Sequence, residues 1–451
     1  MTIAAAADHS RVSFAEALRY WLKLGFISFG GPAGQIAIMH RELVEQRRWI
    51  SERRYLHALN YCMLLPGPEA QQLATYVGWL MHGAKGGIAA GVLFVLPSLF
   101  ILVALSWIYM AYGSLPLIAG VLYGVKPAVV AIVLFAAWRI GSRALRHPAL
   151  WLVAAGAFAA ISLLRAPFPA IILAAGLIGL AGSRVAPHAF EAGGHGAQKS
   201  KAVEPAHAKA LIDDDSPTPP HARWSVKRLW LFASVGLAIW VGAIVGIAYG
   251  SGWNGTLIQL AWFFTKAALL TFGGAYAVLP YVNQAAVEQY QWLSASQMID
   301  GLALGETTPG PLIMVVAFVG FVAGWTRELF GADALFAAGA AAATVATFFT
   351  FLPSFLFILI GGPLVEATHG NLRFTAPLTA ITAAVVGVII DLALFFARHV
   401  FWPRGLAEAV EWPAALLAAG AVIALMRFKT GVVPVIGACA LAGLGLRWFS
   451  S

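Results

Sequence analysis

The segment SFGGPAGQIAIMHRELVEQRRWI, residues 28–50, returns as TFGGAYAVLPYVNQAAVEQYQWL, residues 271–293, without a gap. The same offset of 243 residues carries Pro66-Gly67-Pro68 onto Pro309-Gly310-Pro311. Twelve of the forty positions from the first phenylalanine to the last proline are identical in the two copies. The chain is therefore a duplication of one long unit, and not a solenoid of short repeats.

The duplication extends beyond these landmarks. Leu96-Pro97-Ser98 recurs as Leu352-Pro353-Ser354 at an offset of 256, so one 13-residue insertion separates the two copies. We therefore expect two homologous halves. The expected division is an N-terminal tail over 1–13, a first repeat over 14–182, a linker over 183–228, an additional transmembrane helix over 229–250 and a second repeat over 251–451.

The composition predicts an integral membrane protein. Hydrophobic residues make up 60% of the chain, charged residues only 11%, and the mean hydropathy is +0.79. Several apolar runs are long enough to cross roughly 30 Å of hydrocarbon as helices. The first 13 residues lack the apolar core of a removable signal peptide, so we expect insertion through the helices themselves. The expected fold is an all-α polytopic membrane protein in the bilayer, with no nucleic-acid partner, because its basic residues flank apolar segments.

Charge is distributed unequally between the two copies. Arginines crowd the connector after the first Gly-Gly pair, whereas its second copy, residues 284–297, has neither lysine nor arginine. Since cytoplasmic loops are enriched in basic residues, we expect the N-terminus, the first connector and the basic linker in the cytoplasm and the second connector outside. The halves would then form an inverted repeat. The connector arginines are Arg41, Arg47, Arg48, Arg53 and Arg54, and an anion-attracting vestibule is the alternative to a purely topological role.

Both halves contain helix-breaking triplets at membrane depth. Proline removes a backbone donor, and glycine tolerates dihedral angles that other residues avoid, so helices should end and restart at Gly-Gly and Pro-Gly-Pro. Broken backbone inside a bilayer survives only where protein or a watery cavity surrounds it. In inverted-repeat transporters such paired breaks mark the substrate site. A restarted helix exposes unpaired N–H groups that favour an anion.

The candidate substrate-binding residues follow from these breaks. Lys23 and Lys266 lie six residues before each Phe-Gly-Gly, where two ammonium groups would suit a doubly charged tetrahedral oxyanion. Their alternative role is to snorkel to the membrane surface and position a helix. Gln35, Thr307 and Thr308 could donate to oxyanion oxygens, or bond only between helices. The remaining candidates are Phe29, Gly30, Gly31, Pro66, Gly67, Pro68, Phe272, Gly273, Gly274, Pro309, Gly310 and Pro311.

Three carboxylates are candidates for coupling. Glu69 follows the first Pro-Gly-Pro and Glu306 precedes the second, but they are not repeat equivalents. Either could carry a proton, pair with a lysine or cap a restarted helix. Asp391 lies in an apolar run and is expected to pair with a cation. We expect no cofactor and no metal site, because Cys62 and Cys439 lack ligand spacing.

Taken together, these motifs resemble the chromate ion transporter family in its long-chain, two-domain form. Phe29-Gly30-Gly31-Pro32 and Leu65-Pro66-Gly67-Pro68 are similar to its N-terminal signatures, and Thr271-Phe272-Gly273-Gly274 and Thr308-Pro309-Gly310-Pro311-Leu312 to its C-terminal ones. Gly274-Ala275-Tyr276 departs from the pattern, because many members continue with another glycine and a bulky aliphatic residue.

The resemblance implies a multi-pass protein of the bacterial inner (plasma) membrane that exports chromate and confers chromate resistance. The alternatives are transport of sulfate or another oxyanion, including uptake, and a passive anion channel. An intramembrane enzyme is disfavoured, because no zinc-binding His-Glu-x-x-His motif and no nucleophile with a nearby base is present. The sequence leaves open whether the protein forms a homodimer and whether the first segments of each half are full crossings or re-entrant hairpins.

Overall fold

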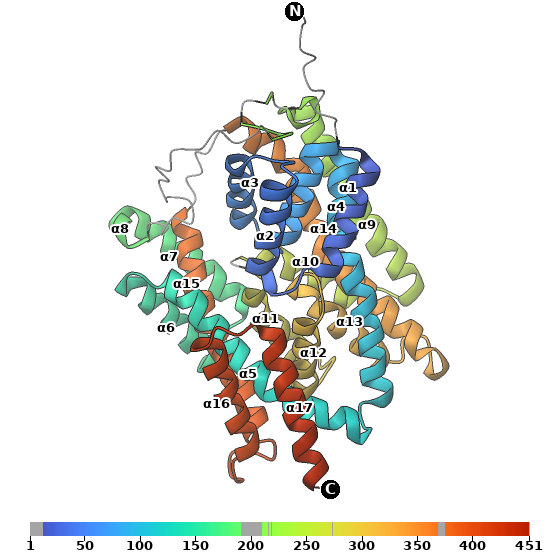
Figure 1. The fold of residues 1–451 in the computed structure, drawn as a ribbon, viewed down its shortest axis with the longest axis vertical. Helices are drawn as coiled ribbons and strands as arrows, with labels where there is room; N and C mark the ends of the chain where they lie inside the picture. The colour runs from blue at the N-terminus through green and yellow to red at the C-terminus, as the bar shows by residue number, and fades with distance from the viewer. Residues whose placement is uncertain are drawn as a thin grey trace, which may run out of the picture.

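A computed structural model describes residues 12–190, 210–214, 216–217, 219–272, 274–368 and 375–450, and these residues are almost entirely helical (Figure 1). Six helical segments in these ranges are long and apolar enough to cross a membrane, which confirms the predicted multi-pass all-α class. They are Glu69–Tyr112, Pro116–Ala144, Phe168–Val185, Val226–Ser251, Ala332–Glu366 and Ala376–Phe401.

The two halves repeat the same order of elements. In the first half, α1 (Phe14–Ile27) ends before the Gly-Gly pair, α2 (Gly31–His40) continues into a π-helical turn η1 (Arg41–Gln46), and α3 (Glu52–Leu64) ends before Pro-Gly-Pro. In the second half, the counterparts are α10 (Thr256–Leu270), α11 (Ala275–Asn283), η3 (Gln284–Gln289) and α12 (Ala295–Thr307). The boundaries of η1 and α3 recur 243 residues later as those of η3 and α12.

These short helices pair into hairpins. Tyr20 of α1 packs against Trp49, while Lys23, one turn further along α1, contacts Glu42, so the two arms run antiparallel around the break. A helix of about 14 residues spans only ~21 Å, less than the ~30 Å of hydrocarbon. The hairpins therefore reach their breaks inside the molecule and return to the same face. Figure 1 shows α2 and α3 nearer one end of the molecule and α12 nearer the other.

The segment α4 (Glu69–Tyr112) is itself a helical hairpin. The backbone leaves helical geometry at His82 and Gly83, where Gly83 has a φ of 68°. Beyond this turn the chain folds back, so that Gly78 contacts Ala90 and Gly91 contacts Gln71. One straight helix of 44 residues would be ~66 Å long, far beyond a bilayer crossing. The first limb is residues 69–81, and the second limb is a full-length helix.

The second half makes the same hairpin from separate elements. η4 (Leu312–Met314) and α13 (Val315–Thr326) correspond to the first limb of α4, and α14 (Leu335–Thr368) contains the counterpart of the second limb. The turn between them carries η5 (Ala332–Ala334). The 13-residue insertion seen in the sequence thus replaces the tight turn at His82 and Gly83.

Each half packs against the last helices of the other. α5 (Pro116–Ala144) lies on α16 (Trp412–Met426) and α17 (Val432–Ser450), and α15 (Thr375–Phe401) lies on α6 (Pro148–Ser162) and α7 (Phe168–Val185). Glycines allow the close approach: Gly124 meets the backbone of Cys439, and Gly387 meets that of Ala154. Small residues at such crossings are typical of helix packing in membranes.

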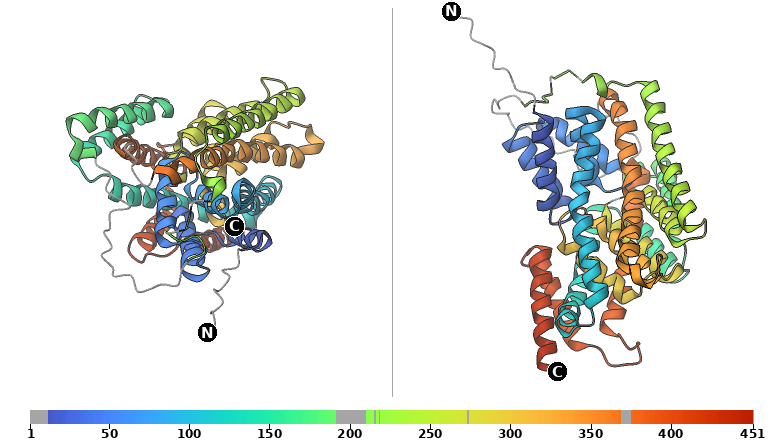
Figure 2. Two further views of the ribbon diagram at one scale, coloured as in Figure 1. Left: turned by 90° about the horizontal axis from the view of Figure 1, so that it is seen from above. Right: turned by 90° about the vertical axis from the view of Figure 1, so that its right-hand side faces the viewer.

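One additional long helix lies outside this repeat. α9 (Val226–Ser251) packs beside α14 and α10 at the periphery (Figure 2), and most of its side chains are exposed, as expected of a lipid-facing helix. The short helices α8 (Pro187–Phe190) and η2 (Pro220–Ala222) lie at the two sides of the linker.

Candidate functional site

The breaks of the two halves meet in symmetric pairs. The Gly67 N–H of the first Pro-Gly-Pro donates to the Thr271 carbonyl at the second Gly-Gly break, over 2.8 Å. The Gly310 N–H of the second Pro-Gly-Pro donates to the Ser28 carbonyl at the first Gly-Gly break, also over 2.8 Å. Both donor and acceptor pairs are related by the 243-residue offset. Each half therefore donates a backbone hydrogen bond to a carbonyl group at the broken helix of the other half.

The two central glycines are required by their surroundings. Gly67 has a φ of 122° and Gly310 a φ of 103°, values that L side chains rarely adopt. A Cβ atom on Gly67 would lie 2.5 Å from the Ser354 Oγ, and one on Gly310 would lie 2.7 Å from the Ser98 Cβ. The repeated Leu-Pro-Ser motif thus places a buried serine against the opposite half's Pro-Gly-Pro loop.

A small pocket lies at the first Gly-Gly break. Gly30 and Gly31, at the start of α2, face Arg139 from α5 and Tyr276 and Glu306 from the second half. A Cβ atom on Gly31 would meet open space. The pocket holds about 20 Å³ of water-accessible space, enough for one or two waters but not for a tetrahedral oxyanion. The other lining residues are Phe135, Ala136 and Val432.

Charges of both signs converge on this pocket. The start of α2 contributes unpaired N–H groups and the positive end of its dipole, and Arg139 adds a full positive charge. Glu306 is only 8% exposed, and its Oε1 accepts a 2.5 Å hydrogen bond from the Tyr276 hydroxyl. The arrangement offers donors to an anion, with one buried carboxyl group beside it.

A different side chain, that of Glu69, lies beside the second Gly-Gly break. Gly274 caps α11 with a φ of 93°, and a Cβ atom there would lie 3.8 Å from the Glu69 Oε1. The Glu69 carboxylate thus stands beside the start of α11, a position that favours negative charge. Gly273 lies outside the described residues. The two breaks share a backbone plan but differ in the groups around them.

The side chains predicted to donate to an oxyanion, those of Gln35, Thr307 and Thr308, bond backbone carbonyls of the protein in this conformation. Gln35 is fully buried, and its Nε2 donates to the Gly310 carbonyl over 2.5 Å and to that of Ser28 over 3.4 Å. The Thr307 hydroxyl donates to carbonyls of its own helix, and Thr308 does the same at the Gly305 carbonyl. Gln35 therefore ties the two halves together, while the threonines close the end of α12.

The other predicted break residues lie in the loops themselves. Phe29 is 40% exposed between α1 and α2, and Phe272 follows α10. The Pro66 carbonyl accepts a 2.8 Å hydrogen bond from Gln72, and Pro68 caps α4. Pro309 precedes Gly310, and Pro311 begins the turn into η4.

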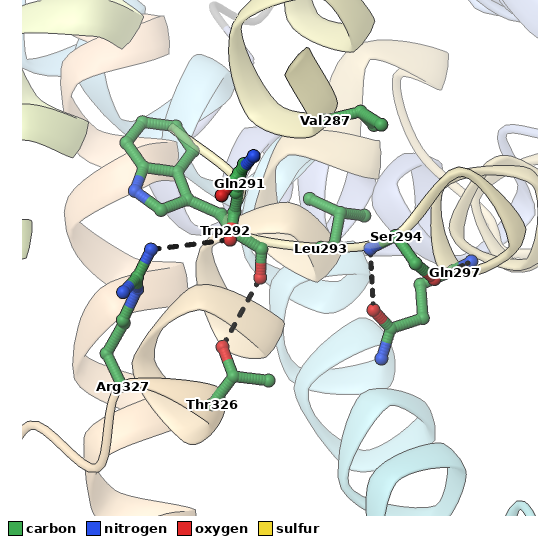
Figure 3. A pocket seen from close by; sticks show the side chains of 8 residues that line it. All are labelled: Val287, Gln291, Trp292, Leu293, Ser294, Gln297, Thr326 and Arg327. Atoms are coloured by element: carbon green, nitrogen blue, oxygen red, sulfur yellow. Dashed lines mark hydrogen bonds between the residues drawn. The ribbon is translucent and has the colours of Figure 1, made fainter. Parts of the chain in front are cut away.

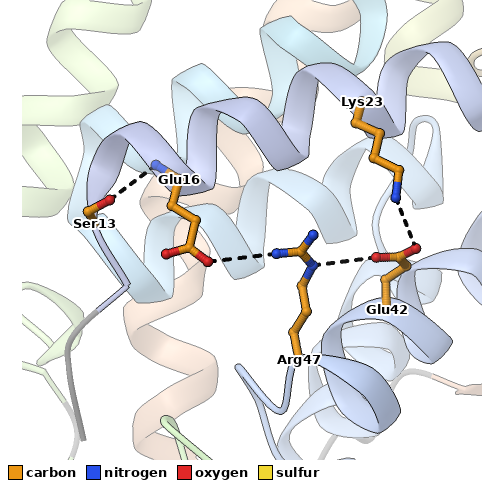
Figure 4. Close-up of polar contacts among 5 residues, drawn as sticks. All are labelled: Ser13, Glu16, Lys23, Glu42 and Arg47. Atoms are coloured by element: carbon orange, nitrogen blue, oxygen red, sulfur yellow. Dashed lines mark hydrogen bonds and ion pairs between the residues drawn. The ribbon is translucent and has the colours of Figure 1, made fainter.

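The two predicted lysines are exposed and are not among the pocket's lining residues. The Lys23 side chain is 52% exposed, and its Nζ lies 3.4 Å from the Glu42 Oε1. Glu42 also accepts from Arg47, which lies 3.7 Å from Glu16 at the start of α1 (Figure 4). Lys266 lies on the exposed face of α10. Lys23 thus joins the two arms of the first hairpin.

Asp391 binds a hydroxyl group in place of the expected cation. The Ser162 Oγ, at the end of α6, donates to its carboxylate, and no ion pair of Asp391 occurs within the described ranges. Ser162 belongs to the first half and Asp391 to the second, so this hydrogen bond joins the two halves. Neither residue lies near a Gly-Gly or Pro-Gly-Pro break in the sequence. Among the described residues, no cluster of His, Cys, Asp or Glu could hold a metal ion.

Sequence reasoning missed Arg139 and Tyr276 as pocket residues. Arg139 lies inside the 29-residue helix α5 and belongs to none of the repeated motifs. Tyr276 was visible as a departure from the expected signature, and its phenol is what reaches Glu306. Neither residue repeats: the offset of 256 carries Arg139 onto Phe395, and the offset of 243 relates Tyr276 to Ala33. A search restricted to duplicated residues cannot find such groups.

Comparison with known proteins identifies two separate matched regions in this chain. A family model described as chromate transporter matches residues 15–180 and 258–444. The chain is 34% identical over 439 residues to the chromate transport protein of Pseudomonas aeruginosa, which covers 96% of this chain and 92% of that protein. It is 30% identical over 448 residues to the chromate transport protein of Cupriavidus metallidurans, covering 98% and 96%. No solved structure matches the chain.

The family resemblance inferred from the broken-helix motifs is thereby confirmed. The two matched regions coincide with the two halves, and the relatives align over almost the entire length. The chain belongs to the chromate transporter family.

Proposed function

We propose that this protein is a secondary transporter that exports chromate across the bacterial inner membrane and so confers chromate resistance. The observation that carries the proposal is the pocket at the first break, where the start of α2 and Arg139 converge on one space. Relatives named as chromate transport proteins support the same cargo. The work of the protein is then transport and not catalysis.

The pocket supplies the groups that a tetrahedral dianion needs. Backbone N–H groups of α2 and the Arg139 guanidinium donate to oxyanion oxygens, and a guanidinium can bind two of them at once. Glu306 would repel a dianion as a carboxylate and would tolerate it once protonated, with its hydroxyl able to donate. Binding of chromate is therefore expected to favour a proton on Glu306. Glu69 lies beside the second break, at a position that is not the repeat equivalent of Glu306, and is a second candidate for proton coupling.

Transport requires the pocket to open. The present cavity is too small for chromate, so the structure is closed around this position. Rocking one half against the other would open the space to each side in turn. The hydrogen bonds from Gly67 and Gly310 lie at the contact between the halves and would act as the pivot.

Direction follows from charge and orientation. The positive-inside rule places the face that carries the basic first connector and the linker, here called the linker face, in the cytoplasm. An inside-negative potential then favours outward movement of a dianion by about 2.3 kcal/mol per charge per 100 mV. Membrane potential alone can drive export, and proton coupling through Glu306 would add to it.

The direct test is flux through purified protein in sealed vesicles. Chromate movement is followed under an imposed potential, with sulfate as competitor, for the wild type and Arg139→Gln, with Arg143→Gln as the matched control on the same helix. We expect potential-driven chromate flux that sulfate inhibits weakly and that Arg139→Gln lowers at least about tenfold. Sulfate transport in preference to chromate would identify a sulfate transporter, and flux that never saturates would identify a channel. Absence of any oxyanion flux would overturn the proposal.

A further inference from the structure

Part of the linker is bound to the first connector by backbone hydrogen bonds. The Leu211 N–H donates to the Arg48 carbonyl over 3.0 Å, and the Ile212 N–H donates to the Trp49 carbonyl over 3.1 Å. The Ser51 N–H donates in return to the Ile212 carbonyl over 3.0 Å. Ile50 and Ile212 form a parallel β-bridge. The linker thus adds a short extended strand to the edge of the connector.

Side chains extend this contact across the linker face. The Ser51 Oγ donates to the Asp214 carboxylate over 2.6 Å, and Arg54 donates to the Ser216 carbonyl over 2.7 Å. Further along, His221 bonds the Trp79 carbonyl over 2.9 Å, at the end of the first limb of α4. The linker therefore contacts the first connector, the start of α3 and the end of the first limb of α4.

The second half closes the same edge with its own side chains. The three equivalent backbone groups belong to Gln291, Trp292 and Ser294, which line a surface pocket on the second connector (Figure 3). Arg327 donates to the Gln291 carbonyl, Thr326 donates to that of Trp292, and the Ser294 N–H donates to the Gln297 Oε1. The duplication thus serves as an internal control, because side chains of the second half bond this edge in one copy and a separate linker segment bonds it in the other.

The charges on the two sides of the linker contact are opposite. The connector carries Arg47, Arg48 and Arg54, and the docked segment carries Asp213 and Asp214. Asp214 is bonded to Ser51, which lies between Arg48 and Arg54 in the sequence, so its negative charge would repel a dianion approaching the connector from the linker face. Attraction by the basic connector raises the local concentration of an anion, and a bound acidic segment cancels it.

We propose that residues 211–214 form an acidic clasp that holds the linker face closed and must detach before an oxyanion can reach the breaks from that side. The acidic clasp competes with the oxyanion, because both are negatively charged and both are attracted to the basic first connector. The proposal rests on the proposed oxyanion transport for its functional consequence, but the contact itself can be tested without transport.

The contact is tested by amide hydrogen exchange on the purified full-length protein without substrate. We expect the amides of Leu211, Ile212 and Ser51 to exchange at least about tenfold more slowly than exposed loop amides such as that of Asp333. Ile212→Asp should remove the protection at Leu211 while α3 stays protected. Unprotected amides in the wild type would overturn the clasp whether or not the protein transports chromate.

The consequence is tested by locking the clasp. In a Cys62→Ala, Cys439→Ala background, Ile50→Cys and Ile212→Cys lie at a β-bridge and can form a disulfide. We expect oxidation to lower chromate flux from the linker face at least about tenfold and reduction to restore it, with no effect in either single-cysteine variant. Equal flux in the oxidised and reduced protein would contradict the proposal, whereas no flux in the unmodified protein would contradict only the proposed function.

The effect of the acidic residues on the substrate is measured through the KM for chromate. Asp213→Asn with Asp214→Asn should lower the KM for chromate from the linker face several-fold at low ionic strength, and the difference should shrink as salt is added. Asp333→Asn, an exposed carboxylate in the turn before α14, is the matched control and should leave KM unchanged. An unchanged KM in the double variant would overturn the role of the acidic residues.

Discussion

The two Gly-Gly breaks come from the same ancestral segment, yet they have become different sites. At the first break the glycines open onto a pocket with Arg139 and Glu306, whereas at the second the Glu69 carboxylate stands beside Gly274. The backbone hydrogen bonds that join the breaks have stayed symmetric. Duplication has therefore preserved the scaffold while the side chains around the two breaks have diverged.

The helices that follow the two Pro-Gly-Pro loops also differ, because the first carries polar side chains where the second carries apolar ones. The first limb of α4 carries Gln71, Gln72 and Thr75, and the equivalent positions in the second half are Met314, Val315 and Phe318. The two glutamines are fully buried, and the Oε1 atoms of both lack a partner within the described ranges. Buried amides of this kind commonly bind ordered water, so a polar path is expected along the first limb and dry packing along its counterpart.

The largest effect should come from substituting the central glycine of each Pro-Gly-Pro loop, a feature that both halves share. Gly67→Ala and Gly310→Ala each combine a strained φ, at about 1–3 kcal/mol, with overpacking of about 1–3 kcal/mol. We expect both variants to lose most folded protein, measured as the yield of monodisperse protein after detergent extraction. Gly420→Ala, where a Cβ atom meets open space, should behave as wild type.

A second change separates this clash from a general loss of stability. Ser98→Gly removes the atom that a Cβ on Gly310 would meet at 2.7 Å. Combined with Gly310→Ala, it should restore part of the yield, whereas Ser354→Gly should not. If Ser354→Gly rescued Gly310→Ala equally well, the contact with Ser98 would not be the reason that position 310 requires glycine.

The next effect should come from Arg139, which only the first half possesses. Arg139→Gln removes a charge-assisted hydrogen bond worth roughly 1.5–3 kcal/mol, which corresponds to about a 10- to 100-fold loss of kcat/KM for chromate. Arg139→Lys should retain part of the activity. Phe395→Leu changes the equivalent residue of the second half and should have little effect on chromate flux. Equal losses from both positions would mean that the halves contribute alike.

Tyr276 should give an intermediate effect. Tyr276→Phe removes a hydrogen bond that stabilises the Glu306 carboxylate without changing the ring, a difference of about 1 kcal/mol in favour of the protonated acid. Because chromate binding is expected to favour a proton on Glu306, the KM for chromate should fall by roughly fivefold. Glu306→Gln, which imitates the protonated acid, should keep chromate binding and weaken the dependence of flux on a proton gradient. Loss of binding in Glu306→Gln would show that the carboxylate charge is needed in the complex.

The smallest effects should come from the duplicated lysines. Lys23 is exposed and bound to Glu42, and exposed ion pairs contribute about 0–1 kcal/mol. We expect Lys23→Met and Lys266→Met to reduce flux less than about fivefold, with normal insertion. Full flux in both variants would remove the lysines from the substrate site, and abolished flux would return them to its centre.

Sequence reasoning reached the repeat, the helical class and the positions of the breaks, because glycine and proline act locally on the backbone. It overlooked the turn at His82 and Gly83, although His82-Gly83-Ala84-Lys85 interrupts the apolar run there. The site was harder to predict for a different reason. Thr307 and Thr308 resemble donors in the sequence but bond their own helix, whereas Arg139 reaches the pocket only through the packing of α5 against the second half.

The most direct test of the interlocked, inverted halves is the sidedness of their two connectors. Gln46 and Gln289 occupy the same repeat position, both are exposed, and both are glutamine. In a Cys62→Ala, Cys439→Ala background, Gln46→Cys and Gln289→Cys are labelled with a membrane-impermeant maleimide in oriented vesicles. We predict that Cys at position 46 reacts only from the cytoplasmic side and Cys at position 289 only from the outside. Labelling of both positions from the same side would contradict the account.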